Sequence, residues 1–355
     1  MEINNQPLRR YDSIQCLRCI AVLLVVWTHA QYLVPPEQRK YFGESFGDVG
    51  VDIFFVISGF VVSSSARTLN FDPRKFFFDR FSRVAPTYWA TSIPFILLSA
   101  YFYVPNWKSV AATFLFFPFF DFQDYSWPSI SAGWTLSFEF WFYSTYALAL
   151  LLFGRRGWIA LLAFYTAGIA VIFNFYDSSY LLPRFLFHPL MLEFSLGILI
   201  FHFREKINFK MAIFGAVASV LFLLHLSTQG SVGNFMPDPI DGFRRLASWG
   251  ACGFFIVLTT IGIDHARPRK WPRWMMNIGG YSFSIYLVQS YAHLFVMRTV
   301  KYLSAPPVVN VILFIVLTFL FGWLASNYVE KPLTHYLRNR FRKNSPVKAP
   351  FRHAL

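Results

Sequence analysis

Ten long apolar stretches restrict the folds that are open to this chain. Each is close to the roughly 20 residues that an α-helix needs to cross a hydrocarbon core ~30 Å thick. With 55% hydrophobic and 14% charged residues, the 355-residue sequence leaves little chain for a soluble domain. We predict an all-α fold, a polytopic integral membrane helix bundle of about ten transmembrane helices, at residues 14–34, 49–66, 84–104, 134–153, 158–175, 185–203, 211–226, 246–264, 276–297 and 308–328.

The basic residues are distributed unevenly between the connections. Most of the 32 lysines and arginines flank the helix ends that share a side with the two chain termini. Such a bias marks the cytoplasmic side of a membrane protein, so both termini are expected to be cytoplasmic. The expected domains are a cytoplasmic N-terminal segment at 1–13, a transmembrane domain at 14–329 and a basic cytoplasmic tail at 330–355, with both ends mobile.

The formal charge of +14 does not require a nucleic-acid partner. Cations next to membrane ends are explained by insertion and by anionic headgroups, so the expected partner is the lipid bilayer. Cys16 and Cys19 form a C-x-x-C, but no second pair of cysteines or histidines stands at metal spacing, and no metal site is expected. The sequence carries no signal of an oligomeric state.

Ionisable residues inside the apolar stretches are candidates for function, because a charge at membrane depth is costly. Arg18 lies near the inner end of the first stretch and His29 in its outer half. Their separation of eleven residues corresponds to ~16 Å and about three turns of helix, so both project from one face. The same face can therefore line a single channel.

Two carboxylates enter the bilayer from the outer side at a depth similar to that of His29. They are Asp52 in the second stretch and Glu139 in the fourth. An acidic partner would orient the imidazole of His29 and raise its basicity, which makes these three the candidate catalytic residues. The alternative is that all three make ordinary polar contacts between buried helices.

Arg80 and Arg83 stand three residues apart at the inner end of the third stretch and so share a helix face. Together with Arg74 and Lys75 they could hold the phosphates of a nucleotide-bearing donor, because guanidinium groups match phosphate geometry. The alternative is that they are ordinary cytoplasmic cations. Charge at the inner end and a base at the outer end suggest a donor that threads inward from the cytoplasm.

Six short elements, in order, resemble those of the membrane acyltransferase 3 family, particularly its members that act on exopolysaccharide. The first apolar stretch has Arg, ten residues, then His, as Arg18 and His29, and the "RFSR" at 80–83 is similar to the Arg-x-x-Arg of the family. The other four elements are "GVDIFFVISGF", "WTLSFEFWFY", "YSFSIYLVQ" and "VEKPL". Two positions differ, because Cys19 replaces a glycine and Gln289 stands where a histidine is common.

The resemblance implies an O-acyltransferase in the bacterial inner membrane, with multiple passes. The donor would be acetyl-CoA or another acyl-CoA as co-substrate, with no permanently bound cofactor, and the acceptor a hydroxyl of an envelope or exported glycan. Arg18, Arg80 and Arg83 would bind the donor. His29 would deprotonate the acceptor or carry the acyl group, with Glu139 or Asp52 orienting it.

Two other functions remain open at this stage. A transporter or flippase would also be a polytopic bundle with charges facing a central path. Such proteins often have paired, broken helices in matching halves, and the sequence shows no convincing internal repeat. The other alternative is a non-catalytic partner of a polysaccharide export machine, in which the polar residues serve packing alone.

Overall fold

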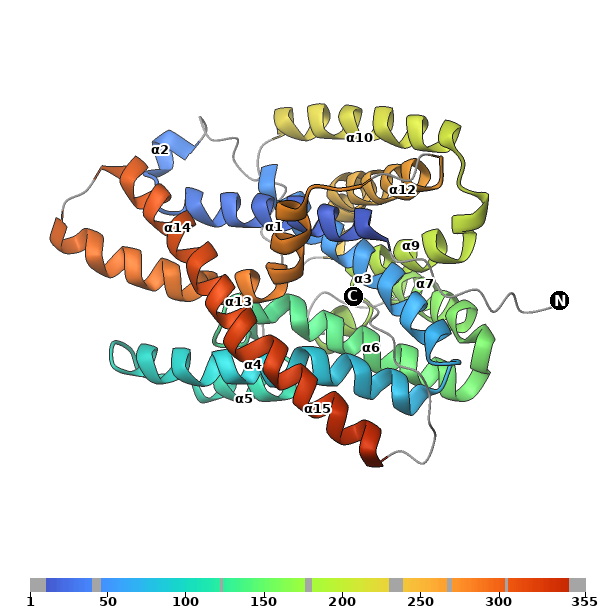
Figure 1. Cartoon of the computed structure of the whole chain (residues 1–355), viewed down its shortest axis with the longest axis horizontal. Helices are drawn as coiled ribbons and strands as arrows, with labels where there is room; N and C mark the ends of the chain where they lie inside the picture. Colours follow the sequence, from blue (N-terminus) through green and yellow to red (C-terminus); the bar gives the residue numbers. More distant parts are fainter. Residues whose placement is uncertain are drawn as a thin grey trace.

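A computed structural model of the chain describes residues 11–39, 46–121, 124–175, 181–229, 239–266, 270–303 and 306–344. These residues are almost entirely helical (Figure 1). The helices are α1 (Asp12–Gln31), α2 (Pro36–Arg39), α3 (Val49–Thr68), α4 (Pro73–Ala100), α5 (Trp107–Leu115), α6 (Gly133–Phe153), α7 (Gly157–Phe175), α8 (Leu181–Leu186), α9 (Leu190–Phe203), α10 (Phe209–Gln229), α11 (Pro239–Arg245), α12 (Ala251–Ala266), α13 (Arg273–Leu303), α14 (Pro307–Ala325) and α15 (Lys331–Asn344).

The remaining regular structure is minor. Short 3₁₀ turns lie at Phe46–Asp48, Gly154–Arg156 and Arg204–Lys206, and two π-helical turns, η5 (Leu246–Gly250) and η6 (Ser326–Glu330), lead into α12 and α15. Strands β1 (Phe119–Asp121) and β2 (Asp124–Ser126) pair antiparallel within the connection from α5 to α6. The predicted all-α class is therefore confirmed for the described residues.

Each of the ten predicted stretches falls on one of the long helices. Seven segments of the described residues are long and apolar enough to cross a membrane: Asp12–Gln31, Val49–Thr68, Gly133–Ile172, Leu181–Lys206, Phe209–Leu226, Asp241–Ala266 and Pro307–Phe341. One of these segments contains both α6 and α7, whereas α4 and α13 are too polar to be among them. The protein is thus a multi-pass membrane protein, while the count of ten and the side of the termini stay predictions.

Helix α3 is central because it packs against α1, α9 and α12 (Figure 1). Its contact with α9 depends on two glycines. A Cβ atom on Gly59 would lie 1.9 Å from the carbonyl oxygen of Phe194, and one on Gly197 would lie 2.0 Å from that of Val56. The two backbones therefore approach as closely as helices can, which is how small residues promote helix association in membranes.

The C-terminal part of the chain differs from the mobile tail that the sequence predicts. Helix α14 continues through η6 into α15, which crosses α4 in Figure 1. Pro332 has no N–H to donate to the carbonyl of Tyr328, and the wide π-helical turn lies where that hydrogen bond is lost. Residues 331–344 are thus a docked helix, whereas 345–355 and the N-terminal 1–10 lie outside the described residues.

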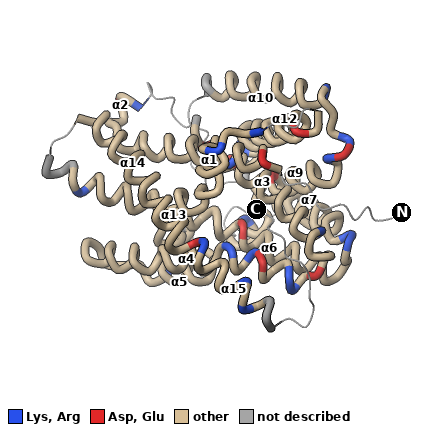
Figure 2. Tube along the Cα trace, in the orientation of Figure 1, with Lys and Arg blue, Asp and Glu red and all other residues tan. Residues whose placement is uncertain are grey.

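The charged residues are distributed unevenly between the two sides of the helix bundle. Figure 2 shows most of the Lys, Arg, Asp and Glu positions toward the centre and toward the side on which α3 ends and α4 begins. The opposite side, where α13 ends and α14 begins, is mostly uncharged in this view. This is the side that the sequence predicts to face away from the cytoplasm.

Candidate active site

Three arginines from two helices meet at the junction of two cavities. Arg18 comes from α1, and Arg80 and Arg83 come from successive turns of α4. All three line both a cavity of about 900 Å³ and a cavity of about 110 Å³, and Val61 of α3 is also shared. The structure therefore brings together the three residues that the sequence predicts to bind the donor.

The larger cavity, here called the mouth cavity, opens at the end of the bundle where α3 stops and α4 starts. Its volume of about 900 Å³ is in the range of small-molecule pockets. Besides the three arginines it is lined by polar residues from the α3 end, the α4 start and α15, including Ser64, Ser65, Thr68, Lys75, Asp79, Glu330, Lys331, Thr334, His335, Arg338 and Asn339.

The smaller cavity, here called the deep cavity, continues from the arginines into the bundle. It follows α3 from Val61 to Val51, which is ~15 Å at the rise of an α-helix. Its other lining residues are mostly apolar or aromatic, with a few polar groups: Phe54, Phe55, Ile57, Ser58, Val84, Thr135, Leu136, Glu139, Tyr143, Ser282, Phe283 and Tyr286.

The three arginines differ in how their charges are compensated. Arg80 is buried against Asp79, with Nη2 2.5 Å from Oδ2, and also donates to Ser65 Oγ at 3.1 Å. Arg18 is only 9% exposed and donates to the neutral amide oxygen of Gln15 at 3.0 Å. Arg83 has no hydrogen bond or ion pair with the described residues. Arg18 and Arg83 thus form no ion pair within the described part of the chain, although Glu330 in the wall of the mouth cavity is within electrostatic range of both.

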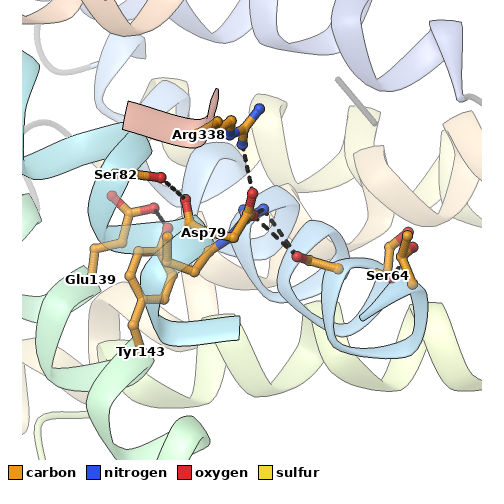
Figure 3. Close-up of polar contacts among 9 residues, drawn as sticks. Ser64, Asp79, Ser82, Glu139, Tyr143 and Arg338 are labelled. Carbon is orange, nitrogen blue, oxygen red and sulfur yellow. Dashed lines mark hydrogen bonds and ion pairs between the residues drawn. The ribbon is translucent and has the colours of Figure 1, made fainter. Parts of the chain in front are cut away.

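Asp79 connects α4 to α15 at the mouth cavity. Its carboxylate accepts from Arg80 and, at 2.7 Å, from Nη2 of Arg338 in α15 (Figure 3). Asp79 precedes the predicted span at 84–104. Burial alone would raise its pKa, but the charges of Arg80 and Arg338 outweigh that effect and hold the pKa of Asp79 below its usual range.

Glu139 lines the deep cavity from the first half of α6. It accepts a hydrogen bond from Ser58 Oγ at 2.7 Å and another from the hydroxyl of Tyr143, one turn further along α6 (Figure 3). Arg18 and Arg80, the two buried arginines of the junction, are within electrostatic range of Glu139. Glu139 is therefore a carboxyl group held by two hydrogen bonds in the wall of the deep cavity.

His29 lies in the last turn of α1 and, unlike Arg18, is not among the described residues that line either cavity, so the single channel expected along this face of α1 is not seen. Its Nδ1 is 2.8 Å from the carbonyl oxygen of Val25. Because a carbonyl oxygen can only accept, Nδ1 carries the proton, and the Nε2 lone pair is left for other chemistry. His293 of α13, one turn after Gln289, is in electrostatic range of His29.

The structure does not bring His29 to the carboxylates that the sequence predicts as its partners. Glu139 bonds to Ser58 and Tyr143, and Asp52 pairs with Arg245, whereas the backbone of Val25 orients His29. The expected His–carboxylate contact is thus corrected to an imidazole oriented by its own helix.

Asp52 is fully buried in a contact that the sequence could not indicate. Arg245, 193 residues later, donates from Nε and Nη2 to its two carboxylate oxygens at 3.0 and 2.7 Å. The sequence analysis also missed Ser58 and Tyr143 as partners of Glu139. Both residues lie within the family-like elements, Ser58 in "GVDIFFVISGF" and Tyr143 in "WTLSFEFWFY".

Comparison with known proteins shows to which family the chain belongs. A family model described as an acyltransferase domain matches residues 11–327, which is most of the chain. The chain belongs to the acyltransferase 3 family. This acyltransferase is 30% identical over 262 residues to the exopolysaccharide production protein ExoZ of Rhizobium meliloti (strain 1021), which covers 70% of this chain and 77% of that protein. No solved structure matches it.

Proposed function

We propose that this acyltransferase transfers an acetyl group from acetyl-CoA, bound from the cytoplasm, to a hydroxyl of an exported or envelope polysaccharide in the bacterial inner membrane. The observation that carries the proposal is the pair Arg18 and Arg83. Both line the junction of the two cavities without a carboxylate partner among the described residues. A buried cation without a partner is costly, so its presence in a cavity wall points to an anionic ligand.

The two cavities match the two parts of an acyl-CoA. The mouth cavity is large and basic, which suits the phosphates of the nucleotide, and guanidinium groups bind phosphate well. The deep cavity, at about 110 Å³, is too small for a nucleotide but is a narrow, mostly apolar passage that suits the pantetheine arm. In this arrangement the thioester passes the arginines and points along α1 toward the level of His29.

The proposed chemistry uses His29 as a general base. The acceptor oxygen attacks the thioester carbonyl carbon, a C–O bond forms, the C–S bond breaks, and coenzyme A leaves as the thiolate. The hydroxyl proton passes to Nε2 of His29, whose other ring nitrogen is held by Val25. The alternative is that Nε2 first takes the acyl group itself and passes it to the acceptor in a second step.

The acceptor class comes from the relative. The printed name of the Rhizobium protein assigns it to exopolysaccharide production, and this chain covers most of its length. We infer the same class of acceptor, an extracytoplasmic polysaccharide or its lipid-linked precursor. Exclusion of water from the passage would protect the thioester from hydrolysis, and the aromatic residues lining the deep cavity suit that role.

The proposal is tested in inside-out membrane vesicles that contain the acceptor glycan and receive radiolabelled acetyl-CoA. Wild type is expected to move label into glycan, and His29→Ala is expected to lose at least about a hundredfold in rate, the range of general-base catalysis. The matched control is His225→Ala, because His225 is exposed on α10 and lines neither cavity. This control should retain the wild-type rate.

Other results would contradict the proposal in different ways. Equal background label in wild type and His29→Ala, at equal protein level, would exclude acetyl-CoA as donor. Passage of glycan across the membrane without label would favour the flippase. Acid-quenched wild type that carries label on His29 would select the two-step mechanism over direct attack.

A further inference from the structure

The face of α15 that carries its polar side chains lines the mouth cavity. Lys331, Thr334, His335, Arg338 and Asn339 recur every three to four residues, so they lie on one side of the helix, and all five are in the cavity wall. A basic helix that lies on a protein normally turns such residues to solvent. In this chain they line an open cavity of about 900 Å³, in which Lys331, His335 and Asn339 stay exposed and Thr334 and Arg338 are partly buried.

Helix α15 is held in this position by contacts with α4 and α13. Arg338 pairs with Asp79 at 2.7 Å, and the rings of Phe341 and Phe78 stack with their centroids 3.8 Å apart. At the start of the helix, the ammonium group of Lys331 lies 4.5 Å from the centre of the Tyr281 ring. The cavity wall is thus fixed at both ends of α15.

The wall that α15 supplies is short of acceptors. Nε of Arg338 and Oγ1 of Thr334 are buried and have no hydrogen-bond partner among the described residues. Around the whole cavity, six lysine and arginine side chains stand against two carboxylates, Asp79 and Glu330. The excess of positive charge and the unpaired hydrogen-bond donors together indicate a ligand that is an anion with several acceptor oxygens.

We propose that α15 is part of the donor site and binds the nucleotide end of acyl-CoA, the diphosphate or the ribose phosphate, through Lys331 and His335. The proposal rests on the function proposed above and extends it to a segment that the family model does not reach, since the match ends at residue 327. Arg18 and Arg83 then hold the part of the donor that enters the deep cavity, and α15 holds the part that stays in the mouth.

The test compares two donors that differ in the nucleotide. The double variant Lys331→Gln, His335→Gln is assayed with acetyl-CoA and with S-acetylpantetheine, which has the same thioester arm but no nucleotide. The KM for acetyl-CoA is expected to rise about tenfold, the effect of losing a charge-assisted hydrogen bond to phosphate, while kcat stays the same. The KM for S-acetylpantetheine is expected not to change.

The matched control is Arg340→Gln, which removes a cation from the same helix. Arg340 is exposed and lies outside the cavity wall, with Nη1 3.3 Å from the hydroxyl of Tyr336. It should leave both KM values at the wild-type level. An equal effect of Arg340→Gln on acetyl-CoA would mean that only the general charge of the surface matters, and would overturn the assignment.

Binding of radiolabelled coenzyme A to the detergent-solubilised full chain separates this inference from the proposed function. If the double variant binds coenzyme A as well as wild type does, the inference is wrong. It is also wrong if the variant raises the KM for both donors equally, because α15 then does not bind the nucleotide. If wild type neither binds coenzyme A nor uses either donor, the proposed function itself fails. The inference stands only if the variant selectively loses affinity for coenzyme A.

Discussion

Arg245, the last residue of α11, donates from Nε and Nη2 to both carboxylate oxygens of Asp52 in the first turn of α3. Both side chains are buried, with exposed fractions of 8% and 0%. The pair therefore ties the start of the η5 turn to the central helix of the bundle. Asp52 is not among the described residues that line either cavity, and we expect it to position α3 against η5.

Replacing one member of this pair should destabilise the protein. Asp52→Asn leaves the guanidinium of Arg245 buried with no opposite charge from that side chain, and breaking a buried pair in this way costs about 3–5 kcal/mol. We expect a lower yield of monodisperse protein and a lower midpoint of thermal unfolding, measured by fluorescence-detected size exclusion after heating.

The double variant Asp52→Asn, Arg245→Gln separates structure from catalysis. With both charges removed, part of the lost stability should return, and acyl transfer should return with it. A double variant that folds like wild type but transfers no acyl group would instead show that Asp52 acts in the reaction.

Arg83→Gln should weaken donor binding without destabilising the fold. Arg83 has no ion-pair partner among the described residues, so removing its charge removes a cost of burial. A charge-assisted hydrogen bond contributes about 1.5–3 kcal/mol, so the KM for acetyl-CoA should rise roughly ten- to hundredfold. Steady-state kinetics and a thermal melt of the same preparation check both parts, and a large drop in the melting midpoint would make Arg83 a structural residue.

Glu139→Gln should slow the reaction while the helices stay packed. The amide keeps one acceptor oxygen for Ser58 or Tyr143, but the negative charge in the wall of the deep cavity is lost. Because Glu139 lies in the wall along which the thioester is proposed to pass, we expect kcat to fall about tenfold, or roughly 1.4 kcal/mol in the barrier, with little change in the melting midpoint. Unchanged kcat would assign the carboxylate to helix packing.

Acid should release α15 from α4. Because the pKa of Asp79 is lowered in the folded protein, its pairing with Arg338 contributes stability at pH values above the ordinary carboxylate pKa of about 4 and loses it as the pH falls through the lowered value. A spin label at position 340 should therefore report the same low mobility from pH 8 to pH 5 and higher mobility below about pH 4. Asp79→Asn should show the high mobility already at pH 7, and a variant that stays immobile would contradict the role of this pair.

Sequence reasoning is strongest where one helix decides the answer. The apolar runs mark the long helices because each helix in a bilayer satisfies its own backbone hydrogen bonds, so length and hydrophobicity suffice. The shared face of Arg18 and His29 follows from helix geometry in the same way. The family resemblance implies that Arg18, Arg80 and Arg83 bind one donor, and the structure places all three in the walls of the same two cavities.

Contacts between distant helices could not be obtained in this way. Nothing in the sequence pairs Asp52 with Arg245, and depth alone wrongly suggested a contact between His29 and a carboxylate. Helix α15 was missed for a different reason: its polar, basic sequence is typical of a solvated tail, and what orders it is Asp79 and Phe78 on α4.

Helix α14 continues without a break through η6 into α15, so the membrane-spanning α14 is directly connected to the wall that α15 supplies to the mouth cavity. The part beyond η6 has 14 residues, or ~21 Å of helix. Turning such an arm by ~10° about η6 moves its far end by ~4 Å. A change in the tilt of the membrane-spanning α14, as in a bilayer of different thickness, would therefore load the contacts of α15 with α4 and, where these give way, change the width of the mouth cavity.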